Sequence, residues 1–289
     1  MLRDAKSQSV CAIREAKDCS AEQLLIREVA QGSYAVDSAF LWPAVSRLKN
    51  DNSQKEYYLT DIVAQAAHEG QTVASFTVPD PAEAFGVNDW LDLQRVDAVL
   101  NSKRVDGFMR QGVRMLQPES VFIDPAVRIA PNASIGPQVQ LRGNTTIGPD
   151  VVIEGTAVIK DCQIAPGAHI KLGVVAEGAV IGAGASVGPF AHIRAGTVLG
   201  EEAKIGNFVE TKKAVLAKGV KASHLTYLGD CSVGENSNIG AGTITCNYDG
   251  YQKSTTTIGS NVFVGSNSSL VAPVVIEDGA TIGAGSVIT

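Results

Sequence analysis

Aromatic residues are scarce in this chain of 289 residues. They make up 6% of the sequence, although 45% of its residues are hydrophobic. That apolar content is typical of a soluble globular protein, but it comes mainly from aliphatic side chains. We therefore expect a narrow core of Ile, Val and Ala. The 29 glycines fit a backbone that turns a corner every few residues.

Excess positive charge, long apolar runs and paired cysteines are also missing. A formal charge of −6 argues against nucleic acid as the main partner. No segment approaches the roughly 18 apolar residues of a membrane span, and residues 1–6 lack the apolar core of a signal peptide. The five cysteines are odd in number and show no CxxC spacing, which excludes a disulfide framework and a zinc site. We expect a cytoplasmic protein without a nucleic-acid or membrane partner.

What the sequence has instead is a six-residue repeat between Ile123 and Thr289. Aliphatic residues recur at every sixth position, with a small or β-branched residue two positions earlier, and Gly, Pro, Asn and Asp supply the corners. No α-helix has this period, so the repeat predicts a solenoid of short parallel strands, of the hexapeptide β-helix type. The aliphatic positions form three runs: Ile123, Ile129, Ile135, Leu141, Ile147, Ile153 and Ile159; Val175, Ile181, Val187, Ile193, Leu199 and Ile205; Ile258, Val264, Leu270, Ile276, Ile282 and Ile288.

The chain before the repeat has ordinary α/β patterning, and we assign residues 1–87 to a separate domain. Ser20 and Gln23 have the spacing of a helix capping box. From residue 88 to 115 apolar residues at helical spacing predict a connecting helix, which leaves 116–289 for the β-helix. In the first domain we expect helices over 20–32 and 57–68 and strands over 9–13, 33–40 and 72–77.

Two stretches interrupt the repeat, at residues 206–228 and 243–257. A solenoid leaves its core rhythm where it extrudes a loop, and such loops often carry function. The first stretch is rich in lysine, and Arg194 stands just after a core aliphatic residue, where glycine is otherwise common. Arginine and lysine together make a phosphate clamp. The alternative is that these lysines are ordinary solvated surface.

His224 lies in the same stretch. Histidine has the side-chain pKa best suited to accept a proton near neutral pH, so a catalytic base is one interpretation. A structural or merely exposed histidine is the other. No Ser-His-Asp pattern, P-loop or cluster of metal ligands is visible, so a nucleophilic or metal-dependent mechanism in the repeat region has no support.

Three long motifs carry a specific resemblance. They read Gly-Asn-Phe-Val-Glu-Thr-Lys-Lys at 206–213, Ser-His-Leu-Thr-Tyr-Leu-Gly-Asp at 223–230, and Asn-Ile-Gly-Ala-Gly-Thr-Ile-Thr-Cys-Asn-Tyr-Asp-Gly at 238–250. In them the chain resembles the bacterial bifunctional GlmU family. Its members join a glucosamine-1-phosphate N-acetyltransferase to an N-acetylglucosamine-1-phosphate uridylyltransferase. Residues 56–61 and 86–88 resemble the uridylyltransferase end, so the resemblance extends over the whole chain.

The resemblance implies a left-handed parallel β-helix that forms a homotrimer, with acetyltransferase sites between subunits. It implies that His224 deprotonates the amine of glucosamine 1-phosphate, which attacks acetyl-CoA directly, and that Glu210 orients His224. The product would feed UDP-N-acetylglucosamine synthesis for the cell wall and lipopolysaccharide. Residues that match sugar-phosphate contacts are Arg194, Lys212, Tyr227, Asn238 and Lys253. Residues that match the acetyl-CoA side, where backbone groups and a hydroxyl steady the oxyanion, are Ala241, Asn247, Tyr248, Ser266 and Ala284.

The chain also departs from the family. Residues 1–87 resemble only the second part of a uridylyltransferase domain, without its phosphate-gripping loop and magnesium-binding aspartate. Glu15 and Asn88 match substrate- and magnesium-site positions, but Ala30 replaces a ligand-binding asparagine. We therefore expect no uridylyltransferase activity, and magnesium only if the missing half were present. A family tail that contributes a basic residue to acetyl-CoA would follow Thr289, and without it we expect weaker acetyl-CoA binding.

Two other functions remain open. One is a related acyltransferase with a different amino sugar or acyl donor, which the retained Arg194, Lys212 and Tyr227 disfavour. The other is a catalytically inactive trimeric scaffold. The residues matching the catalytic centre argue against the scaffold, whereas Ala30 and the short C-terminal end favour it.

Overall fold

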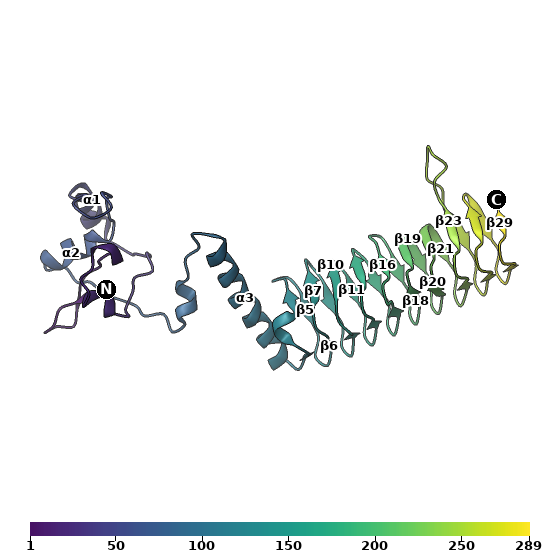
Figure 1. The fold of residues 1–289 in the computed structure, drawn as a ribbon, viewed down its shortest axis with the longest axis horizontal. Coiled ribbons are helices and arrows are strands. Elements are labelled where there is room, and N and C mark those ends of the chain that lie inside the picture. The colour runs from purple at the N-terminus through teal and green to yellow at the C-terminus, as the bar shows by residue number, and fades with distance from the viewer. The chain divides into compact units, whose positions relative to one another are not determined.

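The computed structural model describes residues 1–289, which divide into two compact units, Met1–Asp92 and Leu93–Thr289 (Figure 1). Each unit has its own hydrophobic core. The first unit packs Val10, Ala44, Ile62 and Val63 together. Its elements are β1 (Leu2–Arg3), β2 (Val10–Ala12), η1 (Ala16–Asp18), η2 (Gln23–Leu25), α1 (Ser38–Ser46), α2 (Asp61–His68) and η3 (Pro81–Ala84).

The first unit confirms some of the local predictions and contradicts others. The strand expected over 9–13 is present as β2, α2 forms the second half of the helix expected over 57–68, and residues 88–115 contain the expected helix as α3 (Trp90–Arg110). The helix over 20–32 is wrong. Ser20 and Gln23 do make reciprocal capping hydrogen bonds of 3.0 and 3.3 Å, but only the short turn η2 follows. Leu25 is 81% exposed, and a short helix without a surface to bury its apolar face is marginal in water.

Both additional strands expected in this unit are also absent. Residues 72–77 form no strand, and the segment 33–40 runs into α1. Asp37 explains the second error, because its carboxylate accepts a 2.7 Å hydrogen bond from the backbone N–H of Ala39 and caps the helix.

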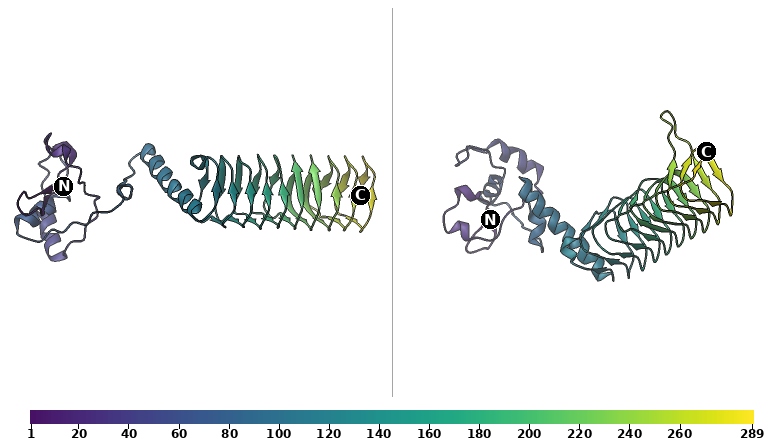
Figure 2. Two further views of the ribbon diagram at one scale, coloured as in Figure 1. Left: turned by 90° about the horizontal axis from the view of Figure 1, so that it is seen from below. Right: turned by 45° about the vertical axis from the view of Figure 1, so that its right-hand side comes forward.

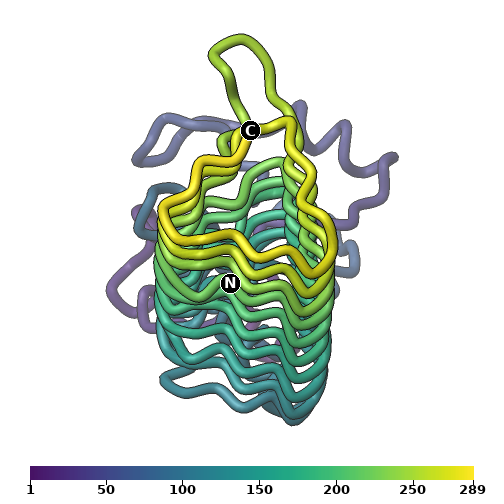
Figure 3. The backbone as a smooth tube through the Cα atoms, turned by 90° about the vertical axis from the view of Figure 1, so that its right-hand side faces the viewer, coloured from purple at the N-terminus to yellow at the C-terminus, as the bar shows by residue number.

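The second unit is a parallel β-solenoid whose strands fall in two sheets, of ten and seventeen strands. Figure 2 shows the coils stacked at regular intervals, and Figure 3 shows them superposed along the solenoid axis. The ten-stranded sheet contains β3 (Arg114–Met115), β6 (Ser134–Ile135), β9 (Val152–Ile153), β12 (His169–Ile170), β15 (Ser186–Val187), β18 (Lys204–Asn207), β20 (Lys221–His224), β22 (Asn238–Ile239), β25 (Phe263–Val264) and β28 (Thr281–Ile282).

The seventeen-stranded sheet covers the other two faces of the coil. Its strands are β4 (Phe122–Ile123), β5 (Arg128–Ile129), β7 (Val139–Arg142), β8 (Thr146–Ile147), β10 (Ala157–Lys160), β11 (Gln163–Ile164), β13 (Val175–Glu177), β14 (Val180–Ile181), β16 (His192–Ile193), β17 (Val198–Leu199), β19 (Glu210–Leu216), β21 (Tyr227–Val233), β23 (Ile244–Cys246), β24 (Thr256–Ile258), β26 (Ser269–Val271), β27 (Val274–Ile276) and β29 (Val287–Ile288).

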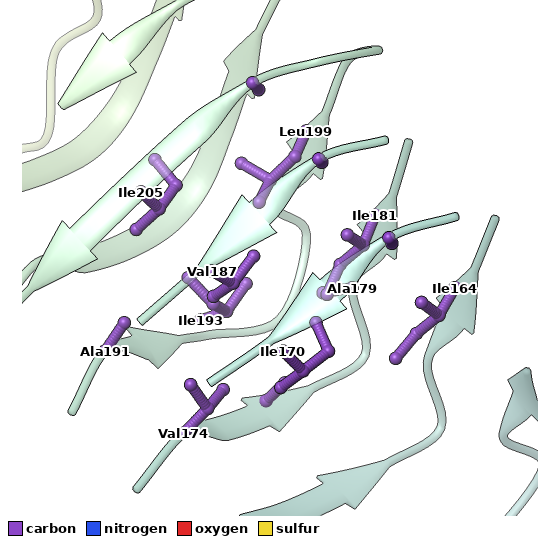
Figure 4. Packing of buried hydrophobic residues seen from close by; sticks show 14 of the residues in the cluster. Ile164, Ile170, Val174, Ala179, Ile181, Val187, Ala191, Ile193, Leu199 and Ile205 are labelled. Atoms are coloured by element: carbon purple, nitrogen blue, oxygen red, sulfur yellow. The ribbon is translucent and has the colours of Figure 1, made fainter. Parts of the chain in front are cut away.

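The six-residue repeat produces this fold because its aliphatic positions, with the exception of Val175, point into the column between the sheets. Ile181, Val187, Ile193 and Leu199 are all at most 1% exposed (Figure 4). Successive coils pair in register, so Ile193 lies beside Thr211 and Thr211 beside Leu228. A single hydrophobic column therefore runs through the whole solenoid.

Changes in coil length account for two errors in the predictions made from the repeat. Val175 is 37% exposed, and its neighbour Ala176 fills the core beside Ile159 instead. Residues 206–228 form no extruded loop but continue the strands β18 to β21. Buried Thr211 and Ala222 stand there at core positions that Ile193 and Ile205 fill one coil earlier, which hides the repeat in the sequence without ending it.

The second interruption, in contrast, is confirmed. Residues 247–255 leave the coil between β23 and β24 as a projecting loop, which is visible beside β23 in Figure 1 and beyond the stacked coils in Figure 3. An antiparallel bridge between Tyr248 and Lys253 closes the loop.

Helix α3 covers the open edge of the first coil. The side-chain amide of Asn101 bonds both the carbonyl of Val121 (2.8 Å) and the N–H of Ile123 (3.0 Å), and Arg104 bonds the carbonyl of Ile123 (2.7 Å). Backbone groups at a sheet edge need such partners. Arg114–Met115, at the end of the range expected to be helical, already form a strand of the solenoid. None of the helices is both long and apolar enough to span a bilayer.

Adjacent residues of β9 test the inward and outward pattern. Ile153 is 1% exposed and Val152 is 40% exposed. We expect Ile153→Ala to lower the free energy of unfolding by about 2–5 kcal/mol, because it leaves a cavity in the core. The control Val152→Ala should change it by less than about 0.5 kcal/mol. Urea unfolding followed by circular dichroism measures both, and equal effects of the two variants would contradict the assignment.

Candidate active site

The residues of interest gather at one corner of the solenoid, where the ten-stranded sheet gives way to the next face. Asn207 and His224 are the last residues of β18 and β20 and are register neighbours. Glu210 and Tyr227 begin β19 and β21 beyond the corner and are also register neighbours. The structure thus brings together residues from two successive coils.

His224 is exposed, and its ring has one hydrogen-bond partner. Nδ1 lies 2.8 Å from Oδ1 of Asn207. An amide oxygen only accepts hydrogen bonds, so with this oxygen facing the ring the bond requires the proton on Nδ1 and leaves the lone pair on Nε2. The backbone at His224 is held as well, because the hydroxyl of buried Thr226 donates to its carbonyl at 2.6 Å. The ring can therefore accept a proton at Nε2.

The corner itself has an uncommon backbone conformation. Leu225 follows His224 with φ of 48°, and Phe208 has φ of 56° one coil earlier. Bulky side chains rarely adopt the left-handed region, but Phe190 has φ of 52° one coil before Phe208, so the conformation belongs to the recurring turn of the solenoid. Both side chains are more than half exposed, and the Phe208 ring stacks on Phe190 with centroids 5.8 Å apart.

Glu210 was expected to orient His224, but its hydrogen bond goes elsewhere. Its Oε1 accepts a 2.7 Å bond from Nη1 of Arg194, and both side chains are about 40% exposed. The residue that contacts the imidazole is Asn207, which the sequence reasoning did not single out. Asn207 precedes His224 by 17 residues, which is one coil length, and this spacing could have indicated from the sequence that the two residues are neighbours.

Three cationic side chains lie together beside Glu210, and we call Arg194, Lys212 and Lys253 the cation cluster. The pKa of Lys212 lies below its usual value, first because of its hydrogen bond with Lys253 and the positive charge of that group. Desolvation and the charge of Arg194 lower it further, and Asp230 acts in the opposite direction. Because mutual repulsion is relieved by an anion, the cluster is suited to bind a phosphate.

Tyr227 reaches toward the same place. Lys212 is the register neighbour of Gly229, and a Cβ at Gly229 would lie 2.3 Å from the Tyr227 hydroxyl oxygen. The phenol ring therefore lies across Gly229, next to the strand that carries Lys212. Any side chain at Gly229 would displace it.

Several of the predicted acetyl-CoA residues continue the line that Asn207 and His224 begin. Extending the register of β20 with β22, β25 and β28 places Ala241, Ser266 and Ala284 at the same corner position in the next three coils. We call the set Asn207, His224, Ala241, Ser266 and Ala284 the His224 column. Asn238 begins β22 beside Lys221 and Phe263, on the same sheet.

The loop 247–255 holds the remaining predicted residues. Asn247 is 8% exposed and donates from Nδ2 to Oδ2 of Asp230. Tyr248 is 59% exposed, and its hydroxyl donates to the carbonyl of Gly250 at 2.6 Å. The bridge from Tyr248 to Lys253 positions the lysine of the cation cluster.

Glu15 and Asn88 lie in the first unit. Glu15 raises the pKa of Tyr34, although burial of the phenol is the larger cause. Asn88 donates through its backbone and side-chain N–H groups to Oδ2 of Asp92, at 3.3 and 3.4 Å. No group of three or more His, Cys, Asp or Glu side chains is arranged to hold a metal ion. Asn88 and Asp92 alone do not form such a group.

Comparison with known proteins gives two matching family models. The model "Bacterial transferase hexapeptide (six repeats)" matches residues 255–289, and the model "GMPPB C-terminal domain" matches residues 118–207. Among solved structures, LpxA, a UDP-N-acetylglucosamine acyltransferase from Bacteroides fragilis 9343, is 21% identical with a TM-score of 0.42. That match covers 56% of this chain and 65% of the other.

Curated relatives match nearly the whole chain. The bifunctional protein GlmU of Geotalea uraniireducens (strain Rf4) is 48% identical over 277 residues, covering 96% of this chain and 61% of that protein. GlmU of Stenotrophomonas maltophilia (strain K279a) is 47% identical over 289 residues, covering 100% and 63%. The chain spans about three fifths of the length of these relatives. Over that span it is homologous to the bifunctional GlmU proteins, as its three long motifs predict.

Proposed function

We propose that the solenoid transfers an acetyl group from acetyl-CoA to the amine of glucosamine 1-phosphate, giving N-acetylglucosamine 1-phosphate for UDP-N-acetylglucosamine synthesis. One observation carries the proposal. A histidine with a free Nε2 lies at the same corner as the cation cluster and at the foot of a column of small residues. The identity of 47–48% to proteins named GlmU supports the choice of substrates.

In this mechanism His224 is the general base. Nε2 accepts a proton from the amine as the nitrogen attacks the thioester carbonyl, and a tetrahedral oxyanion forms. Collapse of that intermediate breaks the C–S bond, and the departing CoA thiolate takes the proton from the imidazolium. Base catalysis of this kind contributes about 10²–10⁴-fold to the rate. No covalent enzyme intermediate is needed.

The cation cluster binds the phosphate of the sugar. Lys212 and Lys253 supply point charges, and Arg194 supplies a planar donor. The role of Glu210 changes accordingly, because its 2.7 Å bond fixes the Arg194 guanidinium rather than the imidazole. Tyr227 and Asn238 flank the sugar from β21 and β22.

The part of the His224 column that follows His224, from Ala241 to Ala284, binds acetyl-CoA. Ala241 and Ala284 leave room along the column for an extended thioester arm, and the exposed Ser266 offers a hydroxyl. Asn247 and Tyr248 bind from the adjacent loop. Backbone N–H groups and the serine hydroxyl at this edge stabilise the oxyanion as charge develops.

The remaining parts of the proposal concern the rest of the chain. Residues 1–87 are related to the second part of a uridylyltransferase domain, residues 88–115 link them to the solenoid, and residues 116–289 coil in the left-handed sense. Glu15 and Asn88 are remnants of that domain's substrate and magnesium sites. The five cysteines are free, which suits a reducing cytoplasm.

The solenoid also carries a surface suited to a homotrimer, which would complete the site with residues of a neighbouring subunit. One face stacks Val180, Val198 and Val215 in register, and each is between 38% and 50% exposed. The outward positions of this face are uncharged over eight successive coils: Thr146, Gln163, Val180, Val198, Val215, Ser232, Thr257 and Val275. A long uncharged surface with exposed valines is typical of subunit interfaces.

The first test is release of the CoA thiol from acetyl-CoA in the presence of glucosamine 1-phosphate. We expect His224→Ala to lower kcat by about 10²–10⁴-fold, because no other group replaces the base. His169→Ala, which removes a partly exposed histidine of the same solenoid that pairs with Glu154, should have no effect. Absence of sugar-dependent release by the folded wild-type protein would reject the proposal. Release with a different amino sugar would favour the related acyltransferase.

A second test addresses the cation cluster. Removing a neighbouring positive charge favours the protonated form of a lysine, so Lys253→Met should raise the pKa of Lys212 toward its ordinary value. The affinity for glucosamine 1-phosphate should fall in the same variant. Titration of the lysine side chains by NMR measures the first effect. Lys218→Met is the control, because Lys218 pairs with Glu201 instead. An unchanged pKa of Lys212 would show that Lys253 does not act on Lys212.

The third test is the oligomeric state. Val198→Glu places a charge in the uncharged face and should convert a trimer to monomers, because a buried unpaired carboxylate is strongly unfavourable. Val152→Glu makes the same change at a valine of similar exposure on a face that also carries Lys204 and Lys221, and should leave the trimer intact. Light scattering after size-exclusion chromatography distinguishes the two. A monomeric wild-type protein would refute the interface.

A further inference from the structure

We infer that Asn207 is the positioning residue for His224: its side-chain oxygen fixes the imidazole in the tautomer whose Nε2 acts as base. The catalytic consequence rests on the proposed function, whereas the tautomer can be measured independently of any activity. The inference departs from the sequence expectation, which gave this role to Glu210.

The geometry assigns Asn207 two contacts with the His224 corner. Its Oδ1 lies 2.8 Å from Nδ1 of His224, and its backbone carbonyl accepts a 3.1 Å bond from the N–H of Leu225. The parallel pairing of β18 with β20, which includes Asn207 beside His224, sets the spacing between the two side chains. The amide therefore holds the ring and the backbone just after it.

An amide and a carboxylate would have different effects at this position. His169 in the same solenoid pairs through Nε2 with Oε1 of Glu154, also at 2.8 Å. A carboxylate favours the protonated imidazole by its charge, and a protonated ring cannot accept the proton of an amine. The neutral oxygen of Asn207 selects the tautomer without adding charge. Asn207 thus keeps His224 available as a base.

Other charged and titratable groups lie on the strands next to His224 without being hydrogen-bonded to its ring. Lys204 and Lys221 lie on the same sheet. Glu210 and Lys212 lie across the corner on β19, where Glu210 bonds Arg194. The neighbouring strand β21 carries Tyr227 and Asp230. None of these replaces the hydrogen bond of Asn207 at Nδ1, so loss of that bond should free the ring to change tautomer and orientation.

The direct experiment is ¹⁵N NMR of the histidine side chains in the full chain. The four histidines permit assignment by comparison with His224→Ala. We expect His224 of the wild type to be protonated at Nδ1, and this preference to be lost in Asn207→Ala. Asn144→Ala removes an exposed corner asparagine near β8 and should leave the spectrum of His224 unchanged. Protonation at Nε2 in the wild type, or an unchanged spectrum in Asn207→Ala, would overturn the inference.

The kinetic experiment uses the same variants. Asn207→Ala should lower kcat by about 10- to 100-fold, as loss of a group that orients a functional histidine does, with little change in KM for the sugar phosphate. Asn207→Asp keeps an acceptor oxygen and should recover most of the rate at high pH. Its acid limb should move to higher pH, because the new carboxylate favours the imidazolium.

The two experiments separate the possible failures. A wild-type chain with the expected tautomer and no acetyltransferase activity would reject the proposed function but support the role of Asn207 at the ring. An active enzyme whose rate and pH profile are the same in Asn207→Ala and Asn207→Asp as in the wild type would overturn the positioning role. Thermal unfolding of each variant checks that the solenoid is folded.

Discussion

Parallel register between successive coils is the constraint on which the rest of the solenoid depends. Each strand pairs with the strand one coil earlier, so every outward side chain lies beside the residue about one coil before it in the sequence. The hydrophobic column enforces this register, because a slip of one residue would turn every core side chain outward. Function on such a scaffold reduces to a choice of residues along lines parallel to the axis. The His224 column and the uncharged face that contains Val180, Val198 and Val215 are two such lines.

The second principle of the site is the separation of its charges. Glu210 and the cation cluster lie on one side of the corner, with the carboxylate bound to Arg194. On the other side the imidazole of His224 meets a neutral amide. A carboxylate shared between Arg194 and His224 would bind the guanidinium less firmly and favour the protonated ring. The observed division places the positive charges on one half of the corner and a neutral amide beside the imidazole on the other.

The sequence predicted the solenoid well because a six-residue period in Ile, Val and Leu is almost unaffected by tertiary context. It failed where one residue was gained or lost per coil. Val175 kept the period but faces outward, and buried threonines such as Thr211 hid strands that are present. Prediction was poorer in the first unit, where Leu24, Leu25 and Val29 have helical spacing but no surface to cover them. Asn207 was missed for another reason, because its role depends on a hydrogen bond between coils and not on its own motif.

The regular coils fix where each side chain lies along the axis, but they do not place a side chain of one line next to a side chain of another line. The loop 247–255 does so here. Its base is anchored by the bond from buried Asn247 to Asp230, and the bridge between Tyr248 and Lys253 turns the chain back toward β19. Lys253 thereby meets Lys212, although the two are far apart in the sequence, and the hydrogen bond and the repulsion between them lower the pKa of Lys212. A ligand of opposite charge relieves the repulsion between two like charges, so the one large departure from the repeat occurs where it would complete the proposed phosphate site.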